Sequence, residues 1–247
     1  FFKSCLDPST KVMAMVKAFS YGSGGYEIAN VLQFHKIDYL AGAYADEGVE
    51  LRKGGISLPI MVMNNDVSSF DLLVRYRLEP ELYSPGLLYA LENFLKNKNI
   101  VDFPVHIELE TGMHRLGFAE EELPILLNSL GTDTFKVQSV FTHLVASEDP
   151  EHDEFTVQQA AVFHRLCDRL ASVIRYSFTR HIANTSGITR HSSLQLDMVR
   201  LGIGLYGIGD NQSASILLRE VSTLKSTIAQ IKYVKAGDSV SYGRRGI

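Results

Sequence analysis

The sequence predicts a (β/α)8 barrel of the TIM type, followed by the start of a second domain rich in β-strands. About eight short apolar runs rich in Val, Ile, Phe and Tyr recur between residues 11 and 207. Segments with helical periodicity separate these runs, and such alternation is typical of βαβ units in a parallel sheet. Eight units in this length suit a closed barrel, although a doubly wound open sheet would give the same pattern.

Several of the expected strands are apolar on consecutive residues, as strands covered on both faces should be. They are residues 11–18, 39–43, 59–63, 78–84, 104–110, 137–145, 179–184 and 198–207.

Helical patterns fill most of the connections between these strands. Residues 26–36 place apolar side chains at i, i+3, i+4 and i+7, and residues 45–55 begin with acidic residues and end in Gly-Gly. These features are typical of an amphipathic helix and a capped helix, respectively. Further helices are expected at 86–96, 120–131 and 153–175, with a short, weakly helical connection at 185–193.

The rhythm changes after Leu217, where polar and apolar residues alternate without a helical pattern. We therefore expect residues 1–217 to form the barrel and residues 218–247 to begin a β-rich C-terminal domain. Because the chain lacks a starting Met and stops at GRRGI, we also expect it to be a fragment of a longer or fused polypeptide.

Composition excludes several function classes. The net charge of −4 gives no electrostatic reason to expect nucleic acid or an anionic membrane as partner. Two cysteines, Cys5 and Cys167, are too few for a disulfide framework, so we expect a reducing, cytoplasmic compartment. No apolar run approaches the roughly 18 residues that span a bilayer, and no metal-ligand motif is apparent.

Polar residues gather where the predicted strands end, which is where barrels carry their chemistry. They are Lys17, Tyr21, Glu108, Glu110, Arg115, His143, Asn184, Thr185 and Arg200, and the small or apolar Gly202 and Ile203 follow Arg200 in the eighth strand.

Lys17 stands at the end of the apolar run VMAMV, just before a glycine-rich turn. Desolvation at the mouth of a barrel lowers the pKa of a lysine, and the neutral amine can then form a Schiff base with an aldehyde such as pyridoxal phosphate. The alternative for Lys17 alone is a strand-end side chain that extends to water.

Two segments have the small residues and hydroxyls that a phosphate site needs, namely ANTSG (183–187) and RLGIG (200–204). Gly202, Gly204 and Gly207 also have the G-x-G-x-x-G spacing of dinucleotide-binding loops. That fingerprint must open a helix after a first strand, whereas this one lies within a predicted strand, so we reject a dinucleotide site.

Six segments together resemble the bacterial alanine racemases, fold-type III enzymes that use pyridoxal phosphate. The match runs in order along nearly the whole chain. The segments are VMAMVKAFSYGSG (12–24), ETGMHRLGF (110–118), FTHLVASED (141–149), HIANTSG (181–187), DMVRLGIGLYG (197–207) and AGDSVSYGRR (236–245).

The resemblance implies interconversion of L- and D-alanine, which supplies D-alanine for peptidoglycan. Lys17 would hold the cofactor as an aldimine and act as the base on one face of the substrate. Tyr242 would act on the opposite face, and in this family that tyrosine comes from the other subunit, so a head-to-tail homodimer is implied.

The resemblance also assigns binding roles at the cofactor. Arg200 would donate a hydrogen bond to the ring nitrogen and disfavour its protonation, which should suppress transamination. Arg115 would contact the cofactor's phenolic oxygen and position the substrate carboxylate. Phosphate and ring contacts would come from Tyr21, Thr185, Gly202, Ile203 and His143.

Glu108 departs from the family, where many members carry a lysine that becomes carbamylated. We expect the Glu108 carboxylate to supply the same negative charge and orient Arg115. Three alternatives stay open: a non-catalytic pyridoxal-phosphate barrel, a racemase of serine or another small amino acid, and a fold-type III decarboxylase. The decarboxylases place an acid where Arg200 stands.

Overall fold

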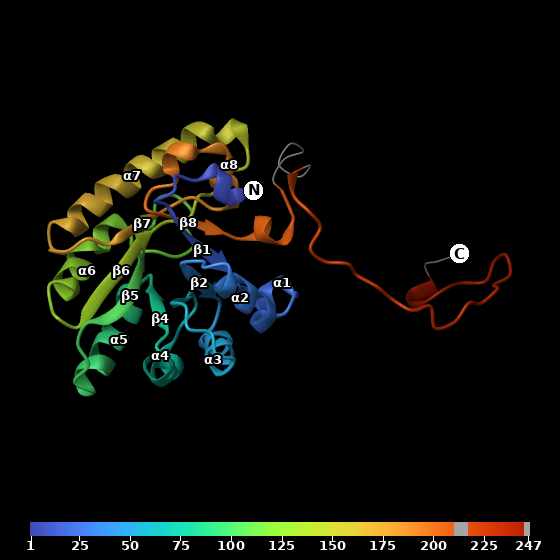
Figure 1. The fold of residues 1–247 in the computed structure, drawn as a ribbon, viewed down its shortest axis with the longest axis horizontal. Coiled ribbons are helices and arrows are strands. Elements are labelled where there is room, and N and C mark those ends of the chain that lie inside the picture. The colour runs from blue at the N-terminus through green and yellow to red at the C-terminus, as the bar shows by residue number, and fades with distance from the viewer. Residues whose placement is uncertain (210–216, 245–247) are drawn as a thin grey trace.

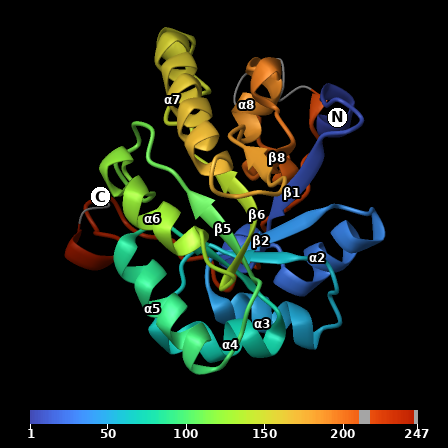
Figure 2. The ribbon, with the colours of Figure 1, turned by 90° about the vertical axis from the view of Figure 1, so that its left-hand side faces the viewer.

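A computed structural model describes residues 1–209 and 217–244. Its centre is a barrel of eight parallel strands with helices outside it (Figures 1 and 2). The strands are β1 (Lys11–Met15), β2 (Tyr39–Gly42), β3 (Ile60–Val62), β4 (Glu79–Leu82), β5 (Phe103–Glu108), β6 (Phe135–Phe141), β7 (Thr179–His181) and β8 (Met198–Leu201).

The sheet closes on itself, so the predicted barrel is confirmed and the open-sheet alternative is wrong. Strand β1 pairs with both β2 and β8, and each of the other ladders joins strands that follow one another in the chain. Strands β7 and β8 are joined by two backbone hydrogen bonds, from Asp197 N to Arg180 O (3.2 Å) and from Arg200 N to Ala183 O (2.9 Å).

The helices follow the strands in the order that the pattern predicts. They are α1 (Lys17–Tyr21), α2 (Gly25–Phe34), α3 (Ala45–Lys53), α4 (Phe70–Tyr76), α5 (Pro85–Asn97), α6 (Leu123–Leu130), α7 (Asp153–Ala171) and α8 (Thr185–Arg190). Helix α4 was not among the helices that the sequence predicts, because it buries only Phe70 and Leu73 and has too few turns for a clear periodicity.

The side chains of the strands separate into two apolar clusters. Met13, Met15, Met61, Phe141 and Met198 belong to a small cluster. Their strand neighbours, such as Val12 and Ala14, belong to a larger one that includes the buried faces of the helices. Because successive side chains of a strand point to opposite faces, the small cluster fills the barrel interior.

The predicted eighth strand was too long. Strand β8 ends at Leu201, and Ile203–Tyr206 form a 3-10 helix. Gly207 ends this turn with φ of 86°, a left-handed conformation that glycine adopts without a steric penalty.

The C-terminal segment extends away from the barrel (Figure 1). Residues 218–241 contain no β-strand, and Tyr242–Arg244 form a short 3-10 helix. A strand needs a hydrogen-bonded neighbour, and the described residues provide none here, so the β-rich second domain stays a prediction. In the described parts of the chain, no helix has the length and apolar character needed to cross a bilayer.

Candidate active site

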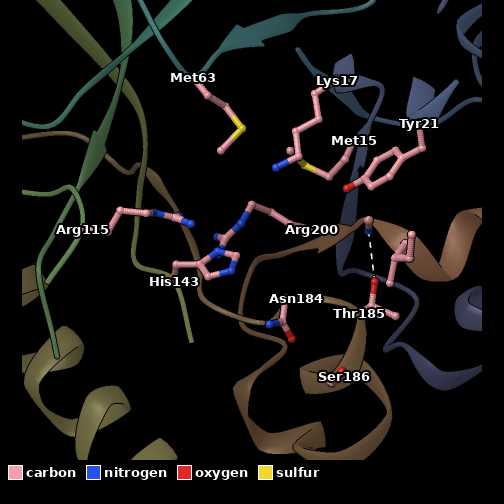
Figure 3. Close-up of a pocket in the computed structure, with 12 residues that line it drawn as sticks. Met15, Lys17, Tyr21, Met63, Arg115, His143, Asn184, Thr185, Ser186 and Arg200 are labelled. Carbon is pink, nitrogen blue, oxygen red and sulfur yellow. Dashed lines mark hydrogen bonds between the residues drawn. The ribbon is translucent and has the colours of Figure 1, made fainter. Parts of the chain in front are cut away.

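A cavity of about 240 Å³ opens at the C-terminal ends of the strands (Figure 3). It brings together eight of the nine site residues that the sequence predicts, all except Tyr242. Its lining residues are Met15, Lys17, Tyr21, Met63, Arg115, His143, Asn184, Thr185, Ser186, Arg200, Gly202 and Ile203.

Lys17 enters the cavity from the end of β1, and the turn after it is unusual. Residues 18–21 all have φ between 51° and 56°, so α1 is a left-handed turn. Such a conformation costs roughly 1–2 kcal/mol per non-glycine residue. The N–H of Ala18 donates to Glu47 Oε1 (2.8 Å), and the turn brings the Tyr21 side chain back to the same cavity as Lys17.

Burial and positive charge both favour the neutral amine of Lys17. Burial lowers the pKa of Lys17, the Arg115 guanidinium lowers it further, and the Glu81 carboxyl partly offsets the effect. A neutral amine is the form that attacks an aldehyde, so the environment of Lys17 suits covalent attachment of a carbonyl compound.

The loops after β7 and β8 meet at one hydroxyl. Thr185 Oγ1 accepts hydrogen bonds from the N–H groups of Gly202 (3.2 Å) and Gly204 (3.3 Å). Among the described residues, the N–H groups of Ser186 and Ile203 have no hydrogen-bond acceptor. These donors, with the Tyr21 hydroxyl close to Gly202, suit an anionic group such as a phosphate.

Arg200 lies under the cavity with its terminal nitrogens held in place. Its Nη1 donates to His181 Nδ1 (2.8 Å), its Nη2 donates to the Thr142 carbonyl (2.6 Å), and its guanidinium lies over the Phe141 ring. Burial lowers the pKa of Arg200 to about 10, so the group stays charged at neutral pH. Its Nε–H has no acceptor among the described residues and can donate to a ligand.

His143 and Arg115 complete the side of the cavity opposite Lys17. Burial, followed by the positive charge of Arg200, lowers the pKa of His143 to about 3, so its ring is neutral. Arg115 has no ion pair with any residue that the structure describes, and its guanidinium points toward Arg200 and His143 (Figure 3). A cation with free donors at this position suits a carboxylate.

Two other groups lie close to the site but were not among the predicted site residues, namely Glu81 on β4 and His181 on β7. Burial, followed by the carboxyl of Glu108, raises the pKa of Glu81 well above its ordinary value. Glu108 is also buried, and no hydrogen bond or ion pair joins it to Arg115 among the described residues. The signal for both missed residues was a charged or polar side chain inside an apolar strand.

Tyr242 does not reach the cavity of its own chain. It lies in the C-terminal segment, and its side chain is fully exposed. Its predicted role therefore stays a prediction about a second copy of the chain.

Comparison with known proteins gives the family. Residues 1–210 match the model of the N-terminal domain of alanine racemase. An alanine racemase from Synechocystis is 32% identical, and the match covers 99% of this chain and 66% of that protein.

Two solved structures have the same fold. The alanine racemase of Clostridium difficile 630 superposes with a TM-score of 0.88 at 30% identity, covering 99% of this chain and 65% of that one. The alanine racemase of Bartonella henselae with covalently bound pyridoxal phosphate gives 0.73 at 26% identity, covering 85% and 59%. The chain thus spans somewhat less than two thirds of the length of these relatives, and it belongs to the alanine racemase family.

Proposed function

We propose that this chain is the barrel part of a pyridoxal-phosphate-dependent racemase that interconverts L-alanine and D-alanine. The observation that carries the proposal is the cavity in which Lys17, with its lowered pKa, and Arg200, with its free Nε–H, both lie. The covalently bound pyridoxal phosphate of the Bartonella henselae relative supports the choice of cofactor.

The residues of the cavity fit the cofactor group by group. The Lys17 amine would hold the aldehyde carbon, and the Arg200 Nε–H would donate to the ring nitrogen. His143 would lie beside the ring. The phosphate would bind Tyr21, Thr185, Gly202 and Ile203, where the unpaired backbone donors lie.

Pyridoxal phosphate, when bound, makes the hydrogen on the substrate's Cα acidic. The chain's own residues then move that proton. The substrate's own amine would take the place of Lys17 at the aldehyde carbon, and the freed Lys17 amine would take or return the proton on one face of Cα. The Tyr242 hydroxyl of a second copy would do so on the other face. Arg115 would hold the substrate carboxylate, so that Cα faces both groups.

Two features support the homodimer and the biological role that we propose. Full exposure of Tyr242 leaves it free to enter the cavity of a partner subunit. D-alanine made in this way would serve peptidoglycan synthesis. The two unpaired cysteines, Cys5 and Cys167, suit the reducing cytoplasm that we propose as the compartment.

The test is loss of optical activity from L-alanine, measured with the full-length polypeptide and pyridoxal phosphate. We expect Lys17→Ala and Tyr242→Phe each to lower kcat by more than about a hundredfold, the range of a missing proton-transfer group. Lys11→Ala, at the opposite end of β1, should leave kcat unchanged. Full activity in both site variants would refute the two-base proposal.

Two further measurements address the alternatives. An absorbance band of bound cofactor without turnover would favour the non-catalytic carrier. Faster turnover of L-serine than of L-alanine would favour a serine racemase, and release of CO₂ would favour a decarboxylase.

A further inference from the structure

Five buried or largely buried side chains form a continuous hydrogen-bonded chain through the barrel. They lie on five consecutive strands, from Arg200 on β8 to His181, Ser139, His106 and finally Glu79 on β4. The successive distances are 2.8 Å (Arg200 Nη1 to His181 Nδ1), 2.7 Å (His181 Nε2 to Ser139 Oγ), 2.6 Å (Ser139 Oγ to His106 Nδ1) and 3.0 Å (His106 Nε2 to Glu79 Oε2).

Arg200 fixes the direction of hydrogen bonding at one end of the chain. A guanidinium has only donors, so His181 Nδ1 must be a bare acceptor. A histidine ring needs a hydrogen on at least one nitrogen, so His181 carries it on Nε2 and donates to Ser139 Oγ. His181 is therefore neutral, and burial together with the charge of Arg200 lowers its pKa well below the ordinary value.

The Ser139 hydroxyl extends this direction to the next ring. Ser139 is fully buried, and its only hydrogen-bond partners among the described residues are His181 and His106. If it accepted from both rings, its own hydrogen would be buried without an acceptor, which costs roughly 1–3 kcal/mol. Ser139 therefore donates to His106 Nδ1, and His106 carries its hydrogen on Nε2, facing Glu79.

Glu79 accepts at the other end of the chain. Its Oε2 accepts from His106 Nε2 and also from the Tyr39 hydroxyl (3.1 Å), as a carboxylate does. Burial lowers the pKa of Arg52, and the negative charge of the nearby Glu79 offsets part of that lowering. A donor-only group at one end and a carboxylate at the other thus impose the same direction.

We propose that Glu79, His106 and Ser139 are positioning residues for Arg200: with His181 they form a one-directional hydrogen-bond chain that keeps His181 a neutral acceptor for the guanidinium. The arrangement holds Nη1 in place and leaves Nε–H as the donor toward the cavity. If His181 were charged, or carried its hydrogen on Nδ1, two donors would face each other at Nδ1 and Nη1, and the guanidinium would be displaced. The consequence for catalysis rests on the proposed function, whereas the chain itself does not.

The direct test is the hydrogen position on both rings, read from long-range ¹H–¹⁵N spectra of ¹⁵N-histidine protein without cofactor at neutral pH. Signals are assigned by replacing His106 and His181 singly. We expect each ring to be neutral, with its hydrogen on Nε2. A hydrogen on Nδ1 of either ring, or a charged His106, would overturn the proposal whatever the enzyme activity.

A second test separates positioning from simple packing. Ser139→Ala should leave His181 Nε2 without its acceptor, shift the His181 signals and lower kcat about tenfold, the scale of one buried hydrogen bond. Ser139→Thr, which keeps a hydroxyl, should restore both. Ser129→Ala is the matched control, since Ser129 is equally buried and donates to Glu92 on the outer helices.

The outcomes are distinguishable from failure of the proposed function. If the protein is not a racemase but both rings carry hydrogen on Nε2, the chain stands. If it is a racemase and Ser139→Ala changes neither the His181 signals nor kcat, the positioning role is refuted. Should Ser139→Ala fail to fold, Glu79→Leu, which removes the terminal acceptor, should shift the His106 signals, and unshifted signals would refute the chain.

Discussion

Thr185 Oγ1 lies 3.2 Å from the N–H of Gly202, and this hydrogen bond joins the loops that follow β7 and β8. The same oxygen accepts from Gly204 N (3.3 Å). Thr185→Val keeps the shape of the side chain but leaves both N–H groups without an acceptor. We expect the free energy of unfolding to fall by about 1–3 kcal/mol, measured by urea denaturation.

Thr185→Val should also weaken cofactor binding. Without the hydrogen bonds to Thr185, the loop after β8 no longer holds Gly202 next to Tyr21. An absorbance titration with pyridoxal phosphate measures this. Thr185→Ser retains the hydroxyl and should behave like the wild type in both measurements. A Thr185→Val variant with unchanged stability and affinity would show that the hydroxyl has no such role.

Gly202 and Gly204 should respond differently to a methyl group. At Gly204 an added Cβ would meet the Phe2 ring and lie 2.6 Å from Thr185 Cγ2, whereas at Gly202 the nearest atom is the Tyr21 hydroxyl at 3.3 Å. Gly204→Ala should therefore lower stability by about 1–3 kcal/mol through overpacking. Gly202→Ala should leave the Tm nearly unchanged and reduce the affinity for pyridoxal phosphate. Equal Tm values for the Gly202→Ala and Gly204→Ala variants would contradict this prediction.

The left-handed turn after Lys17 gives a third prediction. Ala18 is exposed, with φ of 51° and ψ of 51°, a conformation that glycine adopts without the Cβ clash. Ala18→Gly should raise the free energy of unfolding by about 1 kcal/mol. In the right-handed helix α5, Ala90→Gly should lower it by a similar amount, and the two variants are compared by thermal unfolding.

Much of the fold could be predicted from the sequence because the apolar runs of the strands and the periodicity of the helices both repeat often. Apolar runs such as 59–63 and 104–110 and helical periodicity such as 153–175 each have enough residues to be distinct. The errors came where few residues carry the pattern. Helix α4 has seven residues, and Gly202 looked like part of β8 although the chain turns there.

The position of a residue in the cavity was predictable where the residue stands at a strand end next to small residues, as Lys17 and Thr185 do. The positions of His181 and Glu81 near the cavity were not predictable, since their contacts depend on neighbours that only the closed barrel brings together. Ser139 on β6 contacts both His106 on β5 and His181 on β7, and no spacing along the chain reveals that arrangement. Tyr242 stays untested because its proposed target lies in another subunit.

Glu108 offers a fourth prediction, in which its carboxylate stabilises the cations of the site. Its charge raises the pKa of Arg200 against the larger effect of burial, although no direct hydrogen bond joins it to Arg115. If the negative charge of Glu108 orients the Arg115 guanidinium by electrostatic attraction, Glu108→Gln should raise the KM for alanine about tenfold. Steady-state kinetics with unchanged KM and kcat would count against this role.

Glu81 should make the stability of the barrel depend on pH. Burial, followed by the carboxyl of Glu108, raises the pKa of Glu81 in the folded protein well above its ordinary value. Folding therefore takes up a proton at this group. Its contribution to stability is fully present below the pKa of the unfolded chain, and it is lost as the pH rises toward the folded pKa.

Glu81→Gln cannot titrate and resembles the protonated carboxyl in shape and hydrogen bonding. Its free energy of unfolding, from urea denaturation, should match that of the wild type near pH 5 and exceed it increasingly toward pH 8. The exposed Glu50→Gln on α3 is the control and should follow the wild-type pH dependence. If Glu81→Gln also followed it, Glu81 would be ionised in the folded barrel, and the charge balance around Arg200 and Lys17 would include a second buried carboxylate.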